Sequence, residues 1–389
     1  MSLRLGPRRA LLRTVASAAG SALPAYHQVG ASYWAAYKAA YLDGIVSGTA
    51  LSVATLSAMG ASLSGSTKWI GGVLGADGKV YGVPYSSADI LIIDPVAATA
   101  SRSAMGATLS GSNKWHGGAL AANGKIYCAP RQSADILIID TLAATASRSA
   151  MGASLETDGW ASACLGPDGK IYCLPYDAED ILIIDPVAAT ASRSAMGATF
   201  PTTGAKYVSC CLGPDGKIYG IPYNAEEICV IDTVAGTATL TKMGATITVG
   251  SAKWHSASIG TNGKIYAVPL NATDILIIDT VAGTASRSAM GATLSGSNKW
   301  VGSALGPDGK IYGMPFTADD FLIIDPVADT ASRNALGHTF TTDYWEGAVL
   351  APNGKIYGIP FIATDIIIIG NGDAVPLAAA ASGWLNGGV

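Results

Sequence analysis

Short apolar runs alternate with turn-forming residues along most of the chain, always in the same order. Each cycle opens with an aromatic residue, small residues and a Leu or Ile, followed by Asp-Gly or Asn-Gly and then Lys-Ile-Tyr or a close variant ending at a proline. A continuous apolar run such as Ile-Leu-Ile-Ile comes next, and a more polar segment such as Thr-Ala-Ser-Arg-Ser-Ala-Met ends the cycle. Such runs, separated by hairpin-turn residues and without helical periodicity, predict four β-strands per cycle.

The cycle recurs seven times, at a period that is marked by one glycine in each copy. These glycines are Gly78, Gly124, Gly169, Gly216, Gly263, Gly309 and Gly354. Four-stranded repeats of about 46 residues are typical of propeller blades. The sequence therefore predicts an all-β, seven-bladed β-propeller over residues 43–370. Small residues after the aromatic suit an innermost strand that is crowded around the axis, and the apolar third strand suits burial between blades.

The two ends of the repeat array indicate how the ring closes. Residues 54–60 match the outer-strand segment 238–244, although no blade precedes them, whereas residues 366–369 form a third strand that is followed by Gly-Asn-Gly in place of an outer strand. We expect residues 49–58 to complete the seventh blade, which would leave no exposed sheet edge. The segment Val375–Ala380 is the alternative.

The segments Ile-Tyr-x-x-Pro-Tyr, Asp-Ile-Leu-Ile-Ile-Asp-Pro and Thr-Ala-Ser resemble propeller repeats of the YVTN and NHL kind, over about residues 45–370. The resemblance implies the fold and leaves the function open, because such propellers serve as scaffolds, as lectin-like binders and, less often, as enzymes.

Charge separates the first 42 residues from the rest of the chain. Charged residues make up only 13% of the sequence and the net charge is −4, yet residues 1–42 contain no acid. We interpret residues 1–42 as a basic anchoring arm, with Trp34, Tyr37 and Tyr41 spaced as in a short amphipathic helix, and residues 371–389 as a short C-terminal tail. The expected anchoring residues are Arg4, Arg8, Arg9, Arg13, Trp34, Tyr37 and Tyr41.

Two interpretations of this arm lead to different locations. A basic anchor on a β body that has few charges resembles the organisation of bacteriophage tail-fibre or capsid-attached proteins, which implies a virion location and other structural proteins as partners. Alternatively, Arg8-Arg9 followed by small residues resembles a twin-arginine export signal, which implies a periplasmic or secreted protein. Nucleic acid is an expected partner only through the arm, and no apolar run reaches the ~20 residues of a membrane span.

Ligands of propellers commonly bind at the loops between the second and third strands and at the loops that enter the innermost strand. An acid recurs in the first set of loops, and a lysine precedes the aromatic in five blades. These charges could form a ring that binds a polyanion, a sugar or an ion, or each could serve its own blade through local pairing.

Residues that break the repeat are the better candidates for ligand binding. His116 and His255 follow the aromatic where other blades have Ile, Val, Ala or Glu346, and Arg131 replaces the aromatic that usually follows the loop proline. Aromatic rings with carboxylates suit sugar binding. The candidate ligand-binding residues are Tyr85, His116, Arg131, Tyr176, Asp177, Asp180, Tyr223, His255, Phe316, Asp320 and Phe361.

Catalytic and metal motifs are not recognisable. None of the four histidines belongs to a triad or a zinc motif, no phosphate-binding glycine loop precedes a helix, and the six cysteines lack CxxC spacing. We therefore expect a protein without a metal, a cofactor or an enzymatic activity. The leading hypothesis is a virion structural or receptor-binding propeller whose face contacts a host glycan or neighbouring subunits. An exported lectin-like propeller is the alternative, and a hydrolase or lyase that uses Asp177 and Asp180 is a third.

Overall fold

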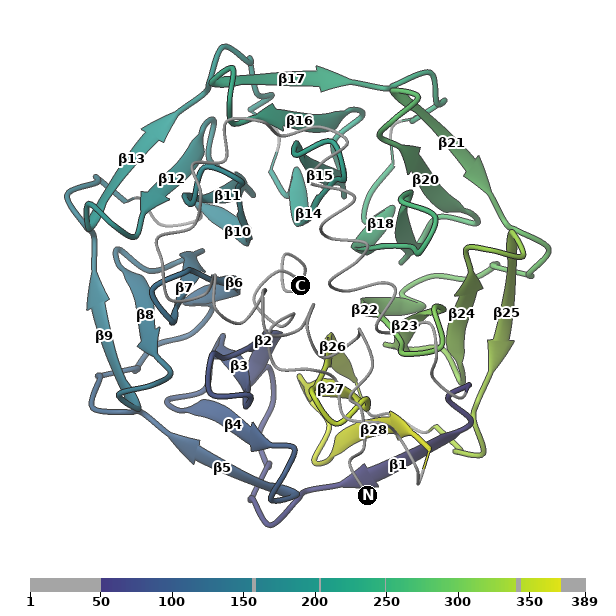
Figure 1. Cartoon of the computed structure of the whole chain (residues 1–389), viewed down its shortest axis with the longest axis horizontal. Helices are drawn as coiled ribbons and strands as arrows, with labels where there is room; N and C mark the ends of the chain where they lie inside the picture. Colours follow the sequence, from purple (N-terminus) through teal and green to yellow (C-terminus); the bar gives the residue numbers. More distant parts are fainter. Residues whose placement is uncertain (1–49, 156–158, 203, 249, 341–343, 372–389) are drawn as a thin grey trace, which may run out of the picture.

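The computed structural model describes residues 50–371, apart from 156–158, 203, 249 and 341–343. Seven four-stranded antiparallel sheets surround a central axis (Figure 1). The predicted all-β, seven-bladed propeller is confirmed. No helix with the length and apolar character of a membrane span occurs within these described ranges.

The sheets are numbered here as blades 1 to 7 in the order of their innermost strands. The innermost strands are β2 (Trp69–Leu74), β6 (Trp115–Leu120), β10 (Trp160–Leu165), β14 (Tyr207–Leu212), β18 (Trp254–Ile259), β22 (Trp300–Leu305) and β26 (Trp345–Leu350). The second strands are β3 (Val80–Pro84), β7 (Lys125–Pro130), β11 (Ile171–Pro175), β15 (Ile218–Pro222), β19 (Ile265–Pro269), β23 (Ile311–Pro315) and β27 (Ile356–Pro360). The third strands are β4 (Ile90–Asp94), β8 (Ile136–Asp140), β12 (Ile181–Asp185), β16 (Ile228–Asp232), β20 (Ile275–Asp279), β24 (Phe321–Asp325) and β28 (Ile366–Gly370). The outer strands are β5 (Thr99–Ser103), β9 (Thr145–Ser149), β13 (Thr190–Ser194), β17 (Thr237–Thr241), β21 (Thr284–Ser288), β25 (Thr330–Asn334) and β1 (Val53–Ser57).

The ring closes in blade 7, where the first and last described strands share one sheet. β1 pairs with β28 in antiparallel register, with Thr55 opposite Ile368. Beside this pair, the hydroxyl of Ser52 donates to Oδ1 of Asn371 at 2.7 Å. β1 lies within the segment 49–58 that the sequence indicates for this role. The alternative segment Val375–Ala380, the arm 1–42 and the tail from residue 372 lie outside the described residues.

Small residues let the innermost strands approach one another closely around the axis. A Cβ added to Gly302 would lie 2.7 Å from the backbone nitrogen of Gly347, and a Cβ on Gly347 would lie 2.8 Å from the Cα of Gly71. Gly302 and Gly347 also have positive φ angles, of 80° and 117°. Glycine is required at these two positions by both the backbone conformation and the space around them.

Each blade has a buried aromatic residue at the start of its innermost strand, and in five blades an arginine of the outer strand lies over its ring. In blade 2, the indole nitrogen of Trp115 donates to the Asp135 carbonyl at 2.7 Å. The guanidinium of Arg148, from the outer strand, lies over the same indole at 5.4 Å from the ring centroid. The equivalent residues in all seven blades are completely buried. The six cysteines, which lack CxxC spacing, are also buried and free.

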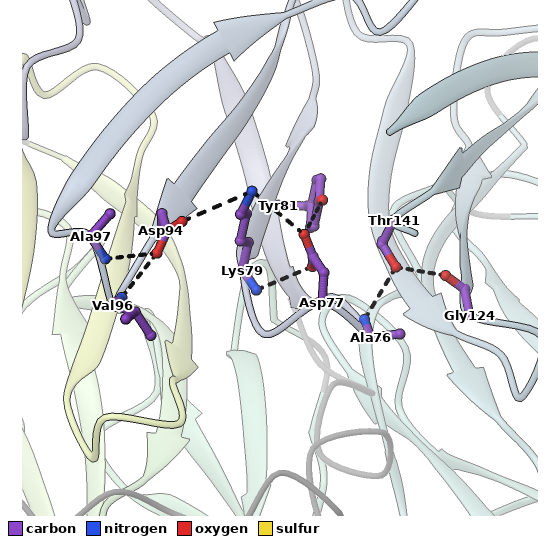
Figure 2. Close-up of polar contacts among 9 residues, drawn as sticks. All are labelled: Ala76, Asp77, Lys79, Tyr81, Asp94, Val96, Ala97, Gly124 and Thr141. Atoms are coloured by element: carbon purple, nitrogen blue, oxygen red, sulfur yellow. Dashed lines mark hydrogen bonds and ion pairs between the residues drawn. The ribbon is translucent and has the colours of Figure 1, made fainter. Parts of the chain in front are cut away.

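Hairpin turns at the opposite end of the strands connect neighbouring blades, as Figure 2 shows for blades 1 and 2. Asp77 of an Asp-Gly turn accepts a hydrogen bond from the Tyr81 hydroxyl at 2.9 Å. The Thr141 hydroxyl accepts from the backbone nitrogen of Ala76 in blade 1 and donates to the Gly124 carbonyl in blade 2. The hydroxyl of Thr141 thus connects the turn of blade 1 with the turn of blade 2.

Candidate functional site

In five of the seven blades, the recurring acid of the loop pairs with an arginine of the outer strand. Asp180 forms an ion pair with Arg193 at 3.0 Å, and Asp320 forms one with Arg333 at 2.9 Å. The equivalent aspartates of blades 1, 2 and 5 have the same kind of partner. Asp180 and Asp320, two of the candidate ligand-binding residues, therefore contact their own blades.

The recurring lysines are also engaged by the scaffold, through backbone carbonyls. Nζ of Lys114 donates to the carbonyls of Tyr85 and Ser87 in the preceding blade, both at 3.0 Å, and to Gly111 at 2.7 Å. Burial lowers the pKa of Lys114 to about 8, so the side chain is still charged at neutral pH. Lys114 thus joins two blades through backbone carbonyls.

The side chains of His116, His255 and Glu346 meet near the axis, and we call these three residues the axial cluster. They belong to β6, β18 and β26, which come from blades 2, 5 and 7 (Figure 1). Oε1 of Glu346 lies 3.3 Å from Nε2 of His255 and 3.8 Å from Nε2 of His116. One donor atom from each residue lies within 4.8 Å of the others. All three side chains are more than nine-tenths buried.

A β-bulge places each residue of the axial cluster. The register between first and second strands shifts between Trp115 and Gly118, between Trp254 and Ser256, and between Trp345 and Ala348. The cluster residue follows the aromatic in each case and lies in the shifted segment. Because a bulge adds a residue without a partner and bends the strand, it can direct that side chain out of the sheet. Here the three side chains meet one another.

The protonation states of the axial cluster suit proton transfer or cation binding. Burial lowers the pKa of His116 to about 4, against an opposing effect of Glu346. Burial raises the pKa of Glu346, but the neighbouring imidazoles of His116 and His255 outweigh this effect and leave the pKa at about 2. A neutral imidazole therefore lies beside a carboxylate at neutral pH. Nδ1 of both histidines is buried without a hydrogen-bond partner among the described residues.

Aromatic side chains lie beside the axial cluster, and we call Tyr85, Tyr223, Phe316, Tyr344 and Phe361 the ring wall. The ring of Tyr85 lies 6.3 Å from that of His116, and the ring of Tyr223 lies 5.8 Å from that of His255. Phe361 contacts both Tyr85 and Phe316, and Phe316 stacks on Tyr344 at 4.7 Å. All these rings except that of Tyr85 are only partly buried.

Arg131 extends the ring wall with a positive charge. Its guanidinium lies 4.1 Å from the ring centroid of Tyr176 and donates a hydrogen bond to the Tyr85 hydroxyl. Asp177 has a different role, because its Oδ1 accepts from the backbone nitrogen of Ala205 at 2.8 Å. Of the candidate ligand-binding residues, the structure thus groups Tyr85, His116, Arg131, Tyr176, Tyr223, His255, Phe316 and Phe361.

Sequence reasoning did not select Glu346 or Tyr344. A signal for Glu346 was available, since polar residues occupy the position after the aromatic in only three blades. The residues at this position are Ile70, His116, Ala161, Val208, His255, Val301 and Glu346. What the repeat could not show is that these three polar side chains meet, because they come from blades that are not adjacent in the chain.

Comparisons with known proteins show the fold and leave the activity open. No protein-family model matches the sequence, and no curated protein sequence matches it significantly. Virginiamycin B lyase from Staphylococcus aureus has a similar structure, with a TM-score of 0.65 and 13% identity over 82% of this chain and 99% of that chain. Hydrazine synthase from Kuenenia stuttgartiensis matches with a TM-score of 0.58 and 14% identity, over 79% of this chain and 97% of that one.

A third similar structure is the extracellular domain of a putative hybrid two component system from B. thetaiotaomicron. It matches with a TM-score of 0.61 and 12% identity, over 85% of this chain and 44% of that chain. At these identities the similarity concerns the propeller fold. None of the three is described as a virion protein, so the expected resemblance to tail-fibre and capsid-attached proteins gains no support.

Proposed function

We propose that this propeller binds a small ligand with a sugar or aromatic ring at the ring wall, and that polar groups of the ligand contact Arg131 and the axial cluster. The observation that carries the proposal is that Arg131 and the axial cluster, which break the repeat, lie beside the aromatic side chains of the ring wall. Rings stack on flat apolar faces, and a few converging polar groups orient the ligand, which is the usual composition of a ligand site.

The axial cluster supports this proposal because the fold does not require it. Four blades have Ile70, Ala161, Val208 and Val301 at the same position, and these blades form the same four strands. Burial of polar groups at the other three positions costs free energy that an apolar residue would avoid. Such a cost is typical of a functional site.

A glycan array tests the proposal, with the purified chain as the probe and with Tyr223→Ala and Phe361→Ala as variants. We expect binding to at least one glycan class and about a tenfold or greater loss in both variants, since truncation of an aromatic residue at the centre of a binding site commonly costs about 2 kcal/mol or more. Val234→Ala, at an exposed position of the turn after β16, is the matched control. Equal binding by all variants would exclude the ring wall as the site.

We further propose that the protein acts outside the cytoplasm. The support is the export-like pattern Arg8-Arg9 and the extracellular location in the description of one structurally similar protein. Fractionation of producing cells, with Arg8→Lys and Arg9→Lys together as the variant, tests export. The virion anchoring role of residues 1–42 stays a prediction, which deletion of that segment and an assembly assay would test.

The axial cluster favours an enzymatic activity as a second candidate. The neutral imidazole of His116, which lies beside the Glu346 carboxylate, can accept a proton from a substrate. In virginiamycin B lyase, a variant with one histidine replaced by alanine is described as catalytically inactive and is bound to quinupristin. Incubation with quinupristin and mass spectrometry would detect turnover, which should disappear in His116→Ala. Binding without turnover would favour the first proposal.

A further inference from the structure

The axial cluster has the composition of a metal site as well as that of a hydrogen-bonded network. It offers two imidazole nitrogens and a carboxylate oxygen, one from each of three blades, within 4.8 Å of one another. The three residues lie in the bulges of β6, β18 and β26, and each of these strands is paired in its own four-stranded sheet. Preorganised donors of this kind need little rearrangement to bind an ion.

We propose that His116, His255 and Glu346 hold a divalent transition-metal ion of the zinc type, with at least one coordination position left for a ligand. Tetrahedral coordination with bonds of about 2.0–2.2 Å places neighbouring donor atoms about 3.4 Å apart. The distances from Oε1 of Glu346 to the two Nε2 atoms, 3.3 and 3.8 Å, are close to that value. Small movements of the side chains would complete the geometry.

The donor set selects the class of ion. Imidazole suits zinc, copper, nickel and iron, whereas magnesium and calcium prefer sites made of oxygen ligands. Three protein ligands are the number that zinc sites use when they keep a position for water or substrate. The ring of Tyr85 lies beside His116 and the ring of Tyr223 beside His255, so a molecule bound to the ring wall would be close to that position.

The polar contacts of the two imidazoles identify Nε2 as the atom that would bind an ion. Nδ1 of both histidines is buried without a hydrogen-bond partner among the described residues. The close polar contacts among the three side chains are therefore those of Nε2 with Glu346, and these are the atoms that an ion would use.

Metal titration of the full chain tests the proposal. The protein, purified without a polyhistidine tag and treated with EDTA, is titrated with Co²⁺ while the visible absorption is recorded, and Zn²⁺ is then added to displace Co²⁺. We expect one ion per chain and a Co²⁺ absorption spectrum that is typical of an ion with few ligands. The affinity for Zn²⁺ should exceed that for Mg²⁺ by at least about a hundredfold.

The variants His116→Ala, His255→Ala and Glu346→Gln should each weaken Zn²⁺ binding about a hundredfold or more, whereas His27→Ala and His338→Ala should not. His255→Val and His116→Ile introduce residues that other blades have at the same position. These variants test the proposal if an alanine variant does not fold. Absence of a stoichiometric ion in the wild type, or unchanged affinity in the cluster variants, would show that the cluster is a hydrogen-bonded brace.

The outcome is separate from that of the proposed ligand binding. Glycan binding that survives EDTA, together with one Zn²⁺ per chain, would support both proposals as independent properties. Absence of Zn²⁺ binding in a wild-type chain that binds the glycan would overturn only the metal site.

Discussion

The residue before the aromatic of each innermost strand and the residue after it differ in how often they recur among the blades. The lysine before the aromatic recurs in five blades, and Lys114 shows why, since it donates to three carbonyls and joins two blades. The residue directly after the aromatic differs from blade to blade and is polar only at His116, His255 and Glu346. Residues two positions apart in the chain thus serve different purposes.

The comparison teaches how to separate scaffold from site in a repeat ring. A charged residue that recurs has a partner in its own blade or in the next, as Asp180 has with Arg193. A polar residue that does not recur has no equivalent set of partners in its own blade, so its partners come from other blades. Glu346 contacts His116 of blade 2 and His255 of blade 5.

The largest effect is expected where the innermost strands approach each other. Gly302→Ala should lower the free energy of unfolding by about 3 kcal/mol or more, or prevent folding, because the new Cβ would lie 2.7 Å from backbone atoms at a positive φ. Gly291→Ala, which has a positive φ but open space around it, is the control and should cost about 1 kcal/mol. Urea denaturation measures both, and equal losses would contradict the close packing.

Replacement of the axial cluster by the residues of other blades should separate stability from function. The triple variant His116→Ile, His255→Val and Glu346→Ile should fold and gain about 1–4 kcal/mol of stability, since buried polar clusters are often less stable than apolar replacements. It should lose Zn²⁺ binding. Thermal and urea unfolding check the first expectation, and a variant that is less stable than the wild type would assign the cluster to the scaffold.

Substitution of a recurring lysine should lower the stability and leave Zn²⁺ binding unchanged. Lys114→Met leaves the carbonyls of Tyr85, Ser87 and Gly111 without this donor and should cost about 1–3 kcal/mol, with Zn²⁺ binding unchanged. Lys125→Met removes a more exposed lysine that pairs with Asp140, and should cost less than about 1 kcal/mol. Similar costs for both would argue against the role of the carbonyl contacts.

The smallest effect concerns the turns after the third strands. Hydrogen bonds from the backbone nitrogens of Ala235 and Val234 contribute to a pKa of Asp232 below its ordinary value. The carboxylate therefore stabilises the fold above pH ~4, and this contribution is lost as the pH falls through the lowered pKa. In Asp232→Asn, which keeps the oxygen acceptor, the free energy of unfolding should fall less between pH 6 and pH 3 than in the wild type. The difference should be less than about 1 kcal/mol. Unfolding curves between pH 3 and 6 would detect the difference, and an identical pH dependence would contradict it.

Much of the fold could be predicted because each blade repeats local signals. Asp-Gly and Asn-Gly turns, the proline that ends each second strand and the apolar third strands fix four strands per blade without any long-range information. The match of residues 54–60 with residues 238–244 even indicates a strand without a blade, and β1 within that region pairs with β28.

The candidate site was harder to predict. His116 and His255 deviate from the repeat and were selected, but so were Asp180 and Asp320, whose arginine partners lie in their own blades.

The sequence by itself determined the number of blades, the strands within them and the positions that break the repeat, since these follow from local patterns of residues. Only the tertiary structure decided which of those positions meet. The reason is geometric, because closure of the ring directs the same position of every blade toward one axis. Side chains from β6, β18 and β26 thereby come within 4.8 Å of one another, although their blades are far apart in the chain.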